Sequence, residues 1–282
     1  MITAKNYAAQ AARGLVDYMN DLIRKGAKYT DDVVTIGELA NCIQQAQHFS
    51  IPDGGKLLEM KEFSSLLDIP FRLPYPIITL EFYGDIGDKR LILAREGVHE
   101  DTGEHIIAVY TIMGKGDRWA MSPLGAYIDI GKSIVLSEDK KSIVVNGFEC
   151  TPTVFKDLND NRKFSQDDIR GNVTYGVIPL CEFIAALSCT NVGTETHQEA
   201  YRDNEKRVRQ GKLPIYETKT LTLNVTSEKK GGKGGGNGSS TPKRQHFRRG
   251  CIRHLASGNY WVNACIVGKN RDGFIDKDYV VK

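Results

Sequence analysis

Apolar residues recur at helical spacing in the first part of the chain. From Thr3 to Lys25, Ala and larger apolar residues return every three or four positions, which predicts an amphipathic helix ended by Gly26. The segment Thr35–Glu38 has the pattern of a capping box and predicts the start of a second helix. A short third helix is expected before Pro70. Residues 1–72 are therefore predicted to form a helical unit.

The hydrophobic pattern changes from residue 73 onward. β-Branched and aromatic runs alternate with charged turns, which is typical of antiparallel strands. An apolar run over 174–189 predicts a helix buried against the sheet, a polar helix is expected at 199–210, and alternation over 215–225 predicts a further strand. Residues 73–226 are expected to form the main body together with 1–72. The strands predicted before the buried helix are Ile77–Tyr83, Leu91–Glu96, His105–Met113, Gly125–Ile130, Ser133–Leu136 and Ser142–Asn146.

A Gly-rich segment at 227–245 separates this body from the C-terminal part. Residues 227–241, SEKKGGKGGGNGSST, contain no apolar residue, so burial cannot offset the entropy of ordering them, and a flexible linker is predicted. A β-meander is predicted over 246–282, with Gly258 in its first turn because glycine tolerates positive φ. The pattern leaves open whether the meander is a separate body or completes the main sheet. Its expected strands are His246–Leu255, Tyr260–Val267 and Phe274–Val281.

These elements together predict an α+β fold with N-terminal helices, an antiparallel β-sheet with a buried helix, and a C-terminal β-meander. The chain has 282 residues and 40% hydrophobic residues, enough for a substantial core. Its net charge of +3 is unevenly distributed. From Ser227 to the end there are twelve Lys and Arg against four Asp and Glu, a net charge of +8, and the 26 cations and 31 anions before it give −5. The C-terminal part is therefore expected to meet an anionic partner.

The six cysteines are dispersed through apolar runs and form no CxxC pair. This usage favours reduced cysteines in the core of a cytosolic protein. The N-terminus lacks the apolar region of a signal peptide, and no window approaches the roughly 18 apolar residues of a membrane span. A soluble protein of the cytoplasm is expected, with no membrane partner.

The basic hairpin, Lys243–Gly268, is the part of the sequence with the clearest chemical character. No acidic residue occurs between Lys229 and Arg271, so the segment would attract phosphates. Aromatic residues beside the cations could add base stacking. The alternative is that the arginines form a solvated strand edge above buried aromatic side chains. The candidate nucleic-acid-binding residues are Lys243, Arg244, His246, Arg248, Arg249, Arg253, His254, Tyr260 and Trp261.

Two kinds of chemistry are conceivable for this hairpin. A zinc site would need converging ligands, but strand alternation places Cys251 on the face opposite His246 and His254, so no metal or other cofactor is predicted. A nuclease could use either histidine as general acid or base beside the arginines. The spacing alone does not establish that reaction, and no catalytic residue is assigned.

Three stretches carry a resemblance to known sequences: SCTN at 188–191, RVRQGKLPIY at 207–216, and HFRRGCIRHLASGNYWVNACIVG at 246–268. They resemble a group of uncharacterised phage and prophage-encoded proteins whose C-termini carry an RRGHIRRL-type strand, a Gly turn, a W-V-x-x-x-V-V-G strand and a closing K-x-Y-x-V strand. Cys251 stands where the pattern has His, and His254 where it often has Arg. The resemblance implies a viral protein acting in the cytoplasm of a host cell, and it implies no mechanism.

The function expected from these observations is non-catalytic nucleic-acid binding, to DNA or RNA, by a phage-encoded protein through its arginine-rich hairpin. A second hypothesis is that the protein binds and inhibits a host protein, such as a defence or replication factor, because Arg and Trp are also favoured in protein interfaces. A phage nuclease is the third. The oligomeric state is left undetermined.

Overall fold

The structure is a computed structural model of the whole chain. It describes residues 5–26, 31–57, 71–85, 87–99, 102–116, 118–130, 134–136, 143–145, 148–152, 165, 171–223, 246–248, 251–262, 265–267 and 280–281. The predicted linker at 227–245 and the third helix before Pro70 lie outside these residues, apart from Leu57, which is buried.

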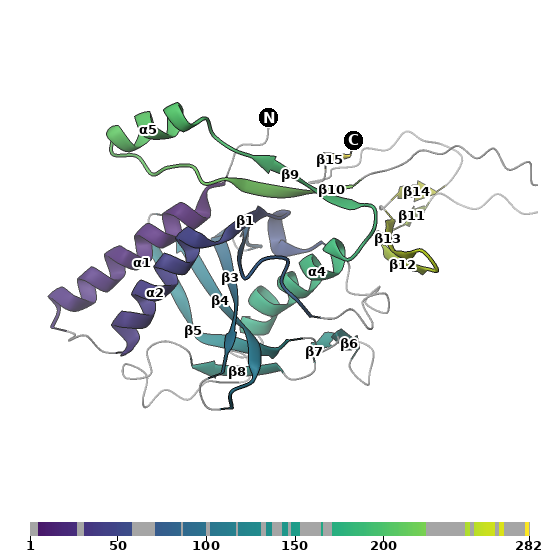
Figure 1. Cartoon of the computed structure of the whole chain (residues 1–282), viewed down its shortest axis with the longest axis horizontal. Coiled ribbons are helices and arrows are strands. Elements are labelled where there is room, and N and C mark those ends of the chain that lie inside the picture. Colours follow the sequence, from purple (N-terminus) through teal and green to yellow (C-terminus); the bar gives the residue numbers. More distant parts are fainter. Residues whose placement is uncertain are drawn as a thin grey trace, which may run out of the picture.

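A sheet with helices on both faces forms the body of the protein (Figure 1). Its strands lie in the order β15-β10-β1-β2-β3-β4-β5-β8, and β9 pairs with β10. The strands are β1 (Gln47–Ser50), β2 (Ile77–Tyr83), β3 (Lys89–Val98), β4 (His105–Lys115), β5 (Arg118–Asp129), β8 (Phe148–Pro152), β9 (Val192–His197), β10 (Thr218–Leu223) and β15 (Val280–Val281).

The predicted α+β class is confirmed, and the sheet itself is mixed. Strands β2, β3, β4 and β5 form an antiparallel meander, as expected, and β8, which was not predicted, extends it. The strands predicted at 133–136 and 142–146 pair with each other in a separate ribbon. On the other side, β1 is parallel to both β2 and β10, and β10 is parallel to β15. Strand β1 was not predicted because QHFS is a short run with a single large apolar residue. It nevertheless lies between β10 and β2, so residues 1–72 contribute to the sheet as well as helices.

Two helices cover one face of the sheet. Helices α1 (Tyr7–Arg24) and α2 (Asp31–Gln45) pack their apolar stripes on β3, β4 and β5. Helix α2 begins before Thr35, so the capping box predicted at Thr35–Glu38 is wrong. The buried stripe explains the earlier start, because Val33 is already buried and Ile36, Ala40 and Ile43 continue it at helical spacing.

The other face is covered by the predicted apolar helix. It comprises a π-helix, η3 (Val173–Val177), followed by α4 (Ile178–Leu187), with Pro179 in the first turn. Leu180, Phe183 and Ile184 pack against strand residues of the same core. The remaining helices and strands are η1 (Asp53–Gly55), β6 (Ile134–Leu136), β7 (Ile143–Val145), α5 (Tyr201–Arg209), β11 (His246–Arg248), β12 (Cys251–Leu255), β13 (Gly258–Val262) and β14 (Cys265–Val267).

The C-terminal segment is attached to this body at two places. Strand β15 joins the main sheet beside β10, and the β12–β13 hairpin lies near the C-terminal end of α4 (Figure 1). The meander therefore both completes the main sheet and forms a small hairpin of its own. Residues 268–279, which include most of the predicted last strand, lie outside the described residues.

Candidate nucleic-acid interface

The described part of the basic hairpin is a tight antiparallel pair. Strand β12 pairs with β13 so that Arg253 lies opposite Tyr260 and Leu255 opposite Gly258. The turn therefore contains only Ala256 and Ser257, fewer than the four residues (256–259) that lie between the two predicted strands. Gly258 has a φ of 114°, so the predicted role of this glycine is confirmed.

The SCTN segment, Ser188–Asn191, holds this hairpin against the body. Cys189 forms a parallel bridge with Asn259, and the Thr190 N–H donates to the Asn259 carbonyl oxygen at 2.8 Å. The Thr190 hydroxyl donates to the same oxygen at 3.1 Å, and the Asn259 side chain donates to the Ser188 hydroxyl at 3.2 Å. Every residue of the segment except Asn191 thus contacts Asn259.

Asn191 forms two short hydrogen bonds across the junction. Its side-chain amide donates to the Trp261 carbonyl oxygen at 2.6 Å, and its Oδ1 accepts from the Trp261 N–H at 2.7 Å. Asn191 is buried, and both hydrogen bonds are shielded from solvent. An amide can satisfy both backbone groups because it carries a donor and an acceptor side by side. This pair fixes the hairpin to the end of α4.

The structure corrects the role predicted for Trp261. Its side chain is 4% exposed and belongs to the core cluster that includes Leu180 and Phe183. Its ring is therefore covered by the protein's own apolar residues and is not available for base stacking. This agrees with the alternative in which the aromatic side chains of the hairpin are buried. Tyr260, the neighbouring residue on β13, is only partly buried. Of the two aromatic residues, Tyr260 remains the candidate.

The junction determines which strand of the hairpin lies outside. Asn259 of β13 is bridged to Cys189 on one side and paired with His254 of β12 on the other. Strand β13 is thus between the body and β12. The outer strand is the one that carries Arg253 and His254.

The other predicted residues lie in less completely described parts. His246 and Arg248 are in β11, where they pair with Val267 and Cys265 of β14. Lys243, Arg244 and Arg249 lie outside the described residues.

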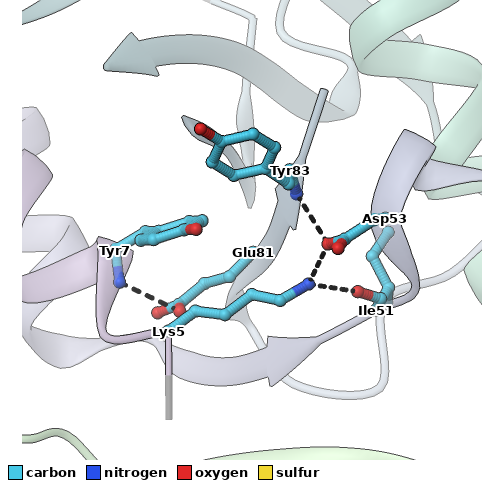
Figure 2. Close-up of polar contacts among 6 residues, drawn as sticks. All are labelled: Lys5, Tyr7, Ile51, Asp53, Glu81 and Tyr83. Atoms are coloured by element: carbon cyan, nitrogen blue, oxygen red, sulfur yellow. Dashed lines mark hydrogen bonds and ion pairs between the residues drawn. The ribbon is translucent and has the colours of Figure 1, made fainter. Parts of the chain in front are cut away.

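A second polar cluster lies where α1 meets the parallel strands (Figure 2). Glu81 of β2 is buried, and its two carboxylate oxygens accept the N–H groups of Tyr7 and Ala8, each at 3.0 Å. Lys5 donates to Asp53 at 2.5 Å and to the Ile51 carbonyl oxygen at 3.0 Å. The exposed Asp53 also accepts the Tyr83 N–H at 3.1 Å.

The chemistry of this cluster favours an anchor over an active site. Glu81 accepts hydrogen bonds from N–H groups that have no partner within the helix, at the helix N-terminus, where the helix dipole also favours negative charge. Burial raises the pKa of the Glu81 carboxyl, and the helix N–H groups act in the opposite direction. Burial also raises the pKa of Tyr7 to about 12. Both Glu81 oxygens already accept backbone bonds, so the group is committed to holding α1.

The remaining candidate chemistry is limited in the part of the chain that the structure describes. No group of three or more His, Cys, Asp or Glu in these residues could hold a metal ion. Cys181 and Cys189 are buried free thiols, and burial raises the pKa of both, that of Cys189 to about 12. Within the described ranges, no helix is both long and apolar enough to cross a membrane.

Sequence reasoning missed the residues that position the hairpin. The SCTN segment carried a resemblance but no assigned role, and only the contacts with Asn259 and Trp261 give it one. Glu81 had a weak signal, since it is a single charged residue within the apolar strand IITLEFY.

No protein-family model, curated protein or solved structure matches the chain.

Proposed function

We propose that this chain is a phage-encoded, non-catalytic nucleic-acid-binding protein that acts in the host cytoplasm through its C-terminal basic hairpin. The observation that carries the proposal is the order of the junction. Because β13 lies between Ser188–Asn191 and β12, the strand that carries Arg253 and His254 is the outer one. A phosphate backbone can approach that strand without displacing the contacts that attach the hairpin.

The charge distribution supports the same partner. The chain from Ser227 onward carries a net charge of +8, and the preceding residues carry −5. The positive C-terminal part attracts phosphates and the negative preceding part repels them, which would orient a nucleic acid on the C-terminal part.

The attachment of the hairpin supports specific contact. Asn191 and Trp261 fix β13 to the body in spite of the long Gly-rich segment that precedes it in sequence. A hairpin already held in place loses less conformational freedom on binding than a free tail would. The hairpin thus preorganises the strand that carries Arg253.

The test is a fluorescence anisotropy titration with labelled single- and double-stranded DNA and RNA, at salt concentrations from about 50 to 200 mM. We expect the logarithm of the affinity for double-stranded DNA to fall linearly with the logarithm of the salt concentration, by about 0.9 per phosphate contacted. Replacing Arg248, Arg249 and Arg253 with Gln should lower that slope by about 2.7 and weaken binding to every sequence.

A matched control is available on α5, which Figure 1 shows at the far end of the β9–β10 ribbon from the hairpin. Replacing Arg202, Lys206 and Arg209 with Gln removes the same charge from exposed positions of that helix. This variant should retain the slope of the unaltered protein. Equal losses in both variants, or absence of binding to all four nucleic acids at low salt, would contradict the proposal. Gel analysis of the labelled strands should show no cleavage.

A further inference from the structure

A buried polar cluster lies on the face of the sheet that α4 and η3 cover. Arg90 of β3 is 2% exposed and Thr111 of β4 is 3% exposed. Thr111 pairs with Ile92, two positions along β3 from Arg90, so both side chains lie on the same face. This cluster is separate from the hairpin and from the Glu81 anchor.

The hydrogen-bonding capacity of the cluster is only partly used. Arg90 Nε donates to Asp88 at 2.8 Å, and the guanidinium carbon lies 3.8 Å from the centre of the Tyr175 ring. Among the described residues, Arg90 Nη1 and Thr111 Oγ1 have no hydrogen-bond partner. Leaving a buried charged donor without a partner costs more than the roughly 1–3 kcal/mol of a neutral group. We therefore expect this donor to bond to an acceptor.

Asp88 does not fill that need. Its Oδ1 also lacks a partner among the described residues, but this oxygen lies against Gly84. A Cβ placed on Gly84 would be 2.6 Å from Arg90 Nε, so Gly84 covers the side of the guanidinium that faces Asp88. Nη1 does not share the Nε–H edge of the group and is left for another acceptor.

The backbone around the cluster is irregular on two sides. The π-helix η3 lies over it, with Tyr175 on Arg90 and the next residue, Gly176, on Thr111. A Cβ on Gly176 would be 2.5 Å from Thr111 Oγ1. The β4–β5 register also shifts between Tyr110 and Ile112, at Thr111 itself. Both π-helices and β-bulges occur frequently at functional sites.

We propose that Arg90 Nη1 and Thr111 Oγ1 bind an oxyanion of a small ligand, a carboxylate or a phosphate group, beneath η3. Arg90 and Thr111 are diagonal neighbours on adjacent strands, and an oxyanion has enough lone pairs to accept from two donors. Tyr175 is 36% exposed and covers the guanidinium, so its ring lies between the cluster and solvent. Asp88 balances the charge of Arg90, which makes the geometry of the donors, rather than charge alone, the basis of recognition.

The test measures thermal unfolding of the full chain in sodium phosphate and in sodium acetate, each compared with sodium chloride at the same ionic strength. We expect a saturable rise in Tm with one or both anions. Comparison of the two anions identifies the preferred group. Thr111→Val removes one donor at nearly constant volume and should weaken the apparent affinity at least tenfold.

Two further variants separate binding from general salt effects. Gly176→Ala places a methyl group over Thr111 and should also abolish the saturable rise. Gly97→Ala is the matched control, because a Cβ on this exposed glycine of β3 meets no atom within 4 Å. Equal anion-dependent shifts in the unaltered protein and in Thr111→Val would overturn the proposal, since preferential exclusion of anions acts on any surface.

A crystal structure grown in phosphate decides the matter if neither site variant folds. An anion bonded to both Arg90 Nη1 and Thr111 Oγ1 supports the proposal. A single water molecule at that position overturns it, because a water would satisfy the same two groups without any ligand.

Discussion

The protein joins distant parts of its chain in two chemically different ways. At the α1 junction, Glu81 accepts the N–H groups of Tyr7 and Ala8 with a buried carboxylate. At the hairpin junction, Asn191 pairs with the backbone of Trp261 through a neutral amide. The hydrogen bonds of the first junction go to a titratable carboxyl group, whereas the side chain that pairs with Trp261 in the second is a neutral amide. Their responses to pH and to substitution should therefore differ.

The difference extends to the parallel part of the sheet. His48 of β1 is buried beside Thr79, with Nδ1 and the threonine hydroxyl 2.7 Å apart, and its ring stacks on Tyr216 at 4.9 Å. Burial lowers the pKa of His48 to about 4. The α1 side of the molecule thus holds ionisable groups out of water, whereas the hairpin junction depends on groups that stay neutral.

The largest expected effect is at the hairpin junction. Asn191→Ala leaves both the N–H and the carbonyl oxygen of Trp261 without their partner, at about 1–3 kcal/mol each, so we expect a loss of about 4 kcal/mol from the attachment of the hairpin. In a Trp119→Phe background, Trp261 is the only tryptophan, and its fluorescence should shift to that of an exposed indole. Unchanged emission would show that the amide pair does not hold the hairpin.

A companion substitution tests whether neutrality matters. Asn191→Asp keeps the acceptor for the Trp261 N–H but brings a carboxylate against the Trp261 carbonyl oxygen at pH 7. Protonation at low pH supplies an O–H that can donate to that oxygen. The hairpin of this variant should therefore detach at neutral pH and return on acidification, and a pH-independent Trp261 emission would contradict the comparison.

The next effect is the pH dependence of the parallel strands. His48 has a depressed pKa in the folded state, so its contribution is present above pH 6.5 and is lost as pH falls toward 4. A shift from 6.5 to about 4 corresponds to about 3 kcal/mol at most. The double variant His48→Phe, Thr79→Val removes this contribution without leaving the hydroxyl unpaired.

The measurement is urea unfolding of both proteins between pH 7 and pH 4. The difference in unfolding free energy should move in favour of the variant as pH falls. His105→Gln, which alters an exposed histidine, should follow the unaltered protein. A constant difference between the double variant and the unaltered protein would exclude the assigned role of His48.

Glu81→Gln should have a smaller effect at neutral pH, about 2 kcal/mol. The amide can accept one of the two helix N–H groups but turns donors toward the other. Because the pKa of Glu81 is raised, its contribution is present below the ordinary value of 4.5 and is lost as pH rises through the folded pKa. The deficit of the variant should therefore widen on acidification, opposite in direction to the His48 effect.

The smallest effect sharpens the role of Asn191 within its segment. Thr190→Val removes an exposed hydroxyl bond to the Asn259 carbonyl oxygen, which also accepts the Thr190 N–H. We expect a loss of about 0.5 kcal/mol and unchanged Trp261 fluorescence. A loss as large as that of Asn191→Ala would mean that the segment, and not the amide, carries the attachment.

Local pattern was sufficient for the elements with strong periodicity. Ile77–Tyr83 was predicted at its observed bounds, and α1, α4 and α5 were expected close to where they lie. A spacing of 2 or 3.6 residues reflects the burial of one face of a strand or helix. The secondary structure of a long amphipathic segment can therefore be predicted from its own sequence. The burial of Trp261 is also consistent with the alternative stated from the sequence, because an aromatic residue in a strand is most often buried.

Tertiary structure decided the parts that depend on distant partners. Strand β1 has four residues and becomes a strand only because β2 and β10 supply bonds on both sides. Glu81 and Asn191 look like ordinary polar residues until the backbone groups they serve, more than 65 positions away, are known. The α+β class and the separation of charge follow from the amino-acid sequence alone. Which strand of the basic hairpin lies outside was decided by the contact between Ser188–Asn191 and β13, because only long-range packing chooses between two edges of equal local propensity.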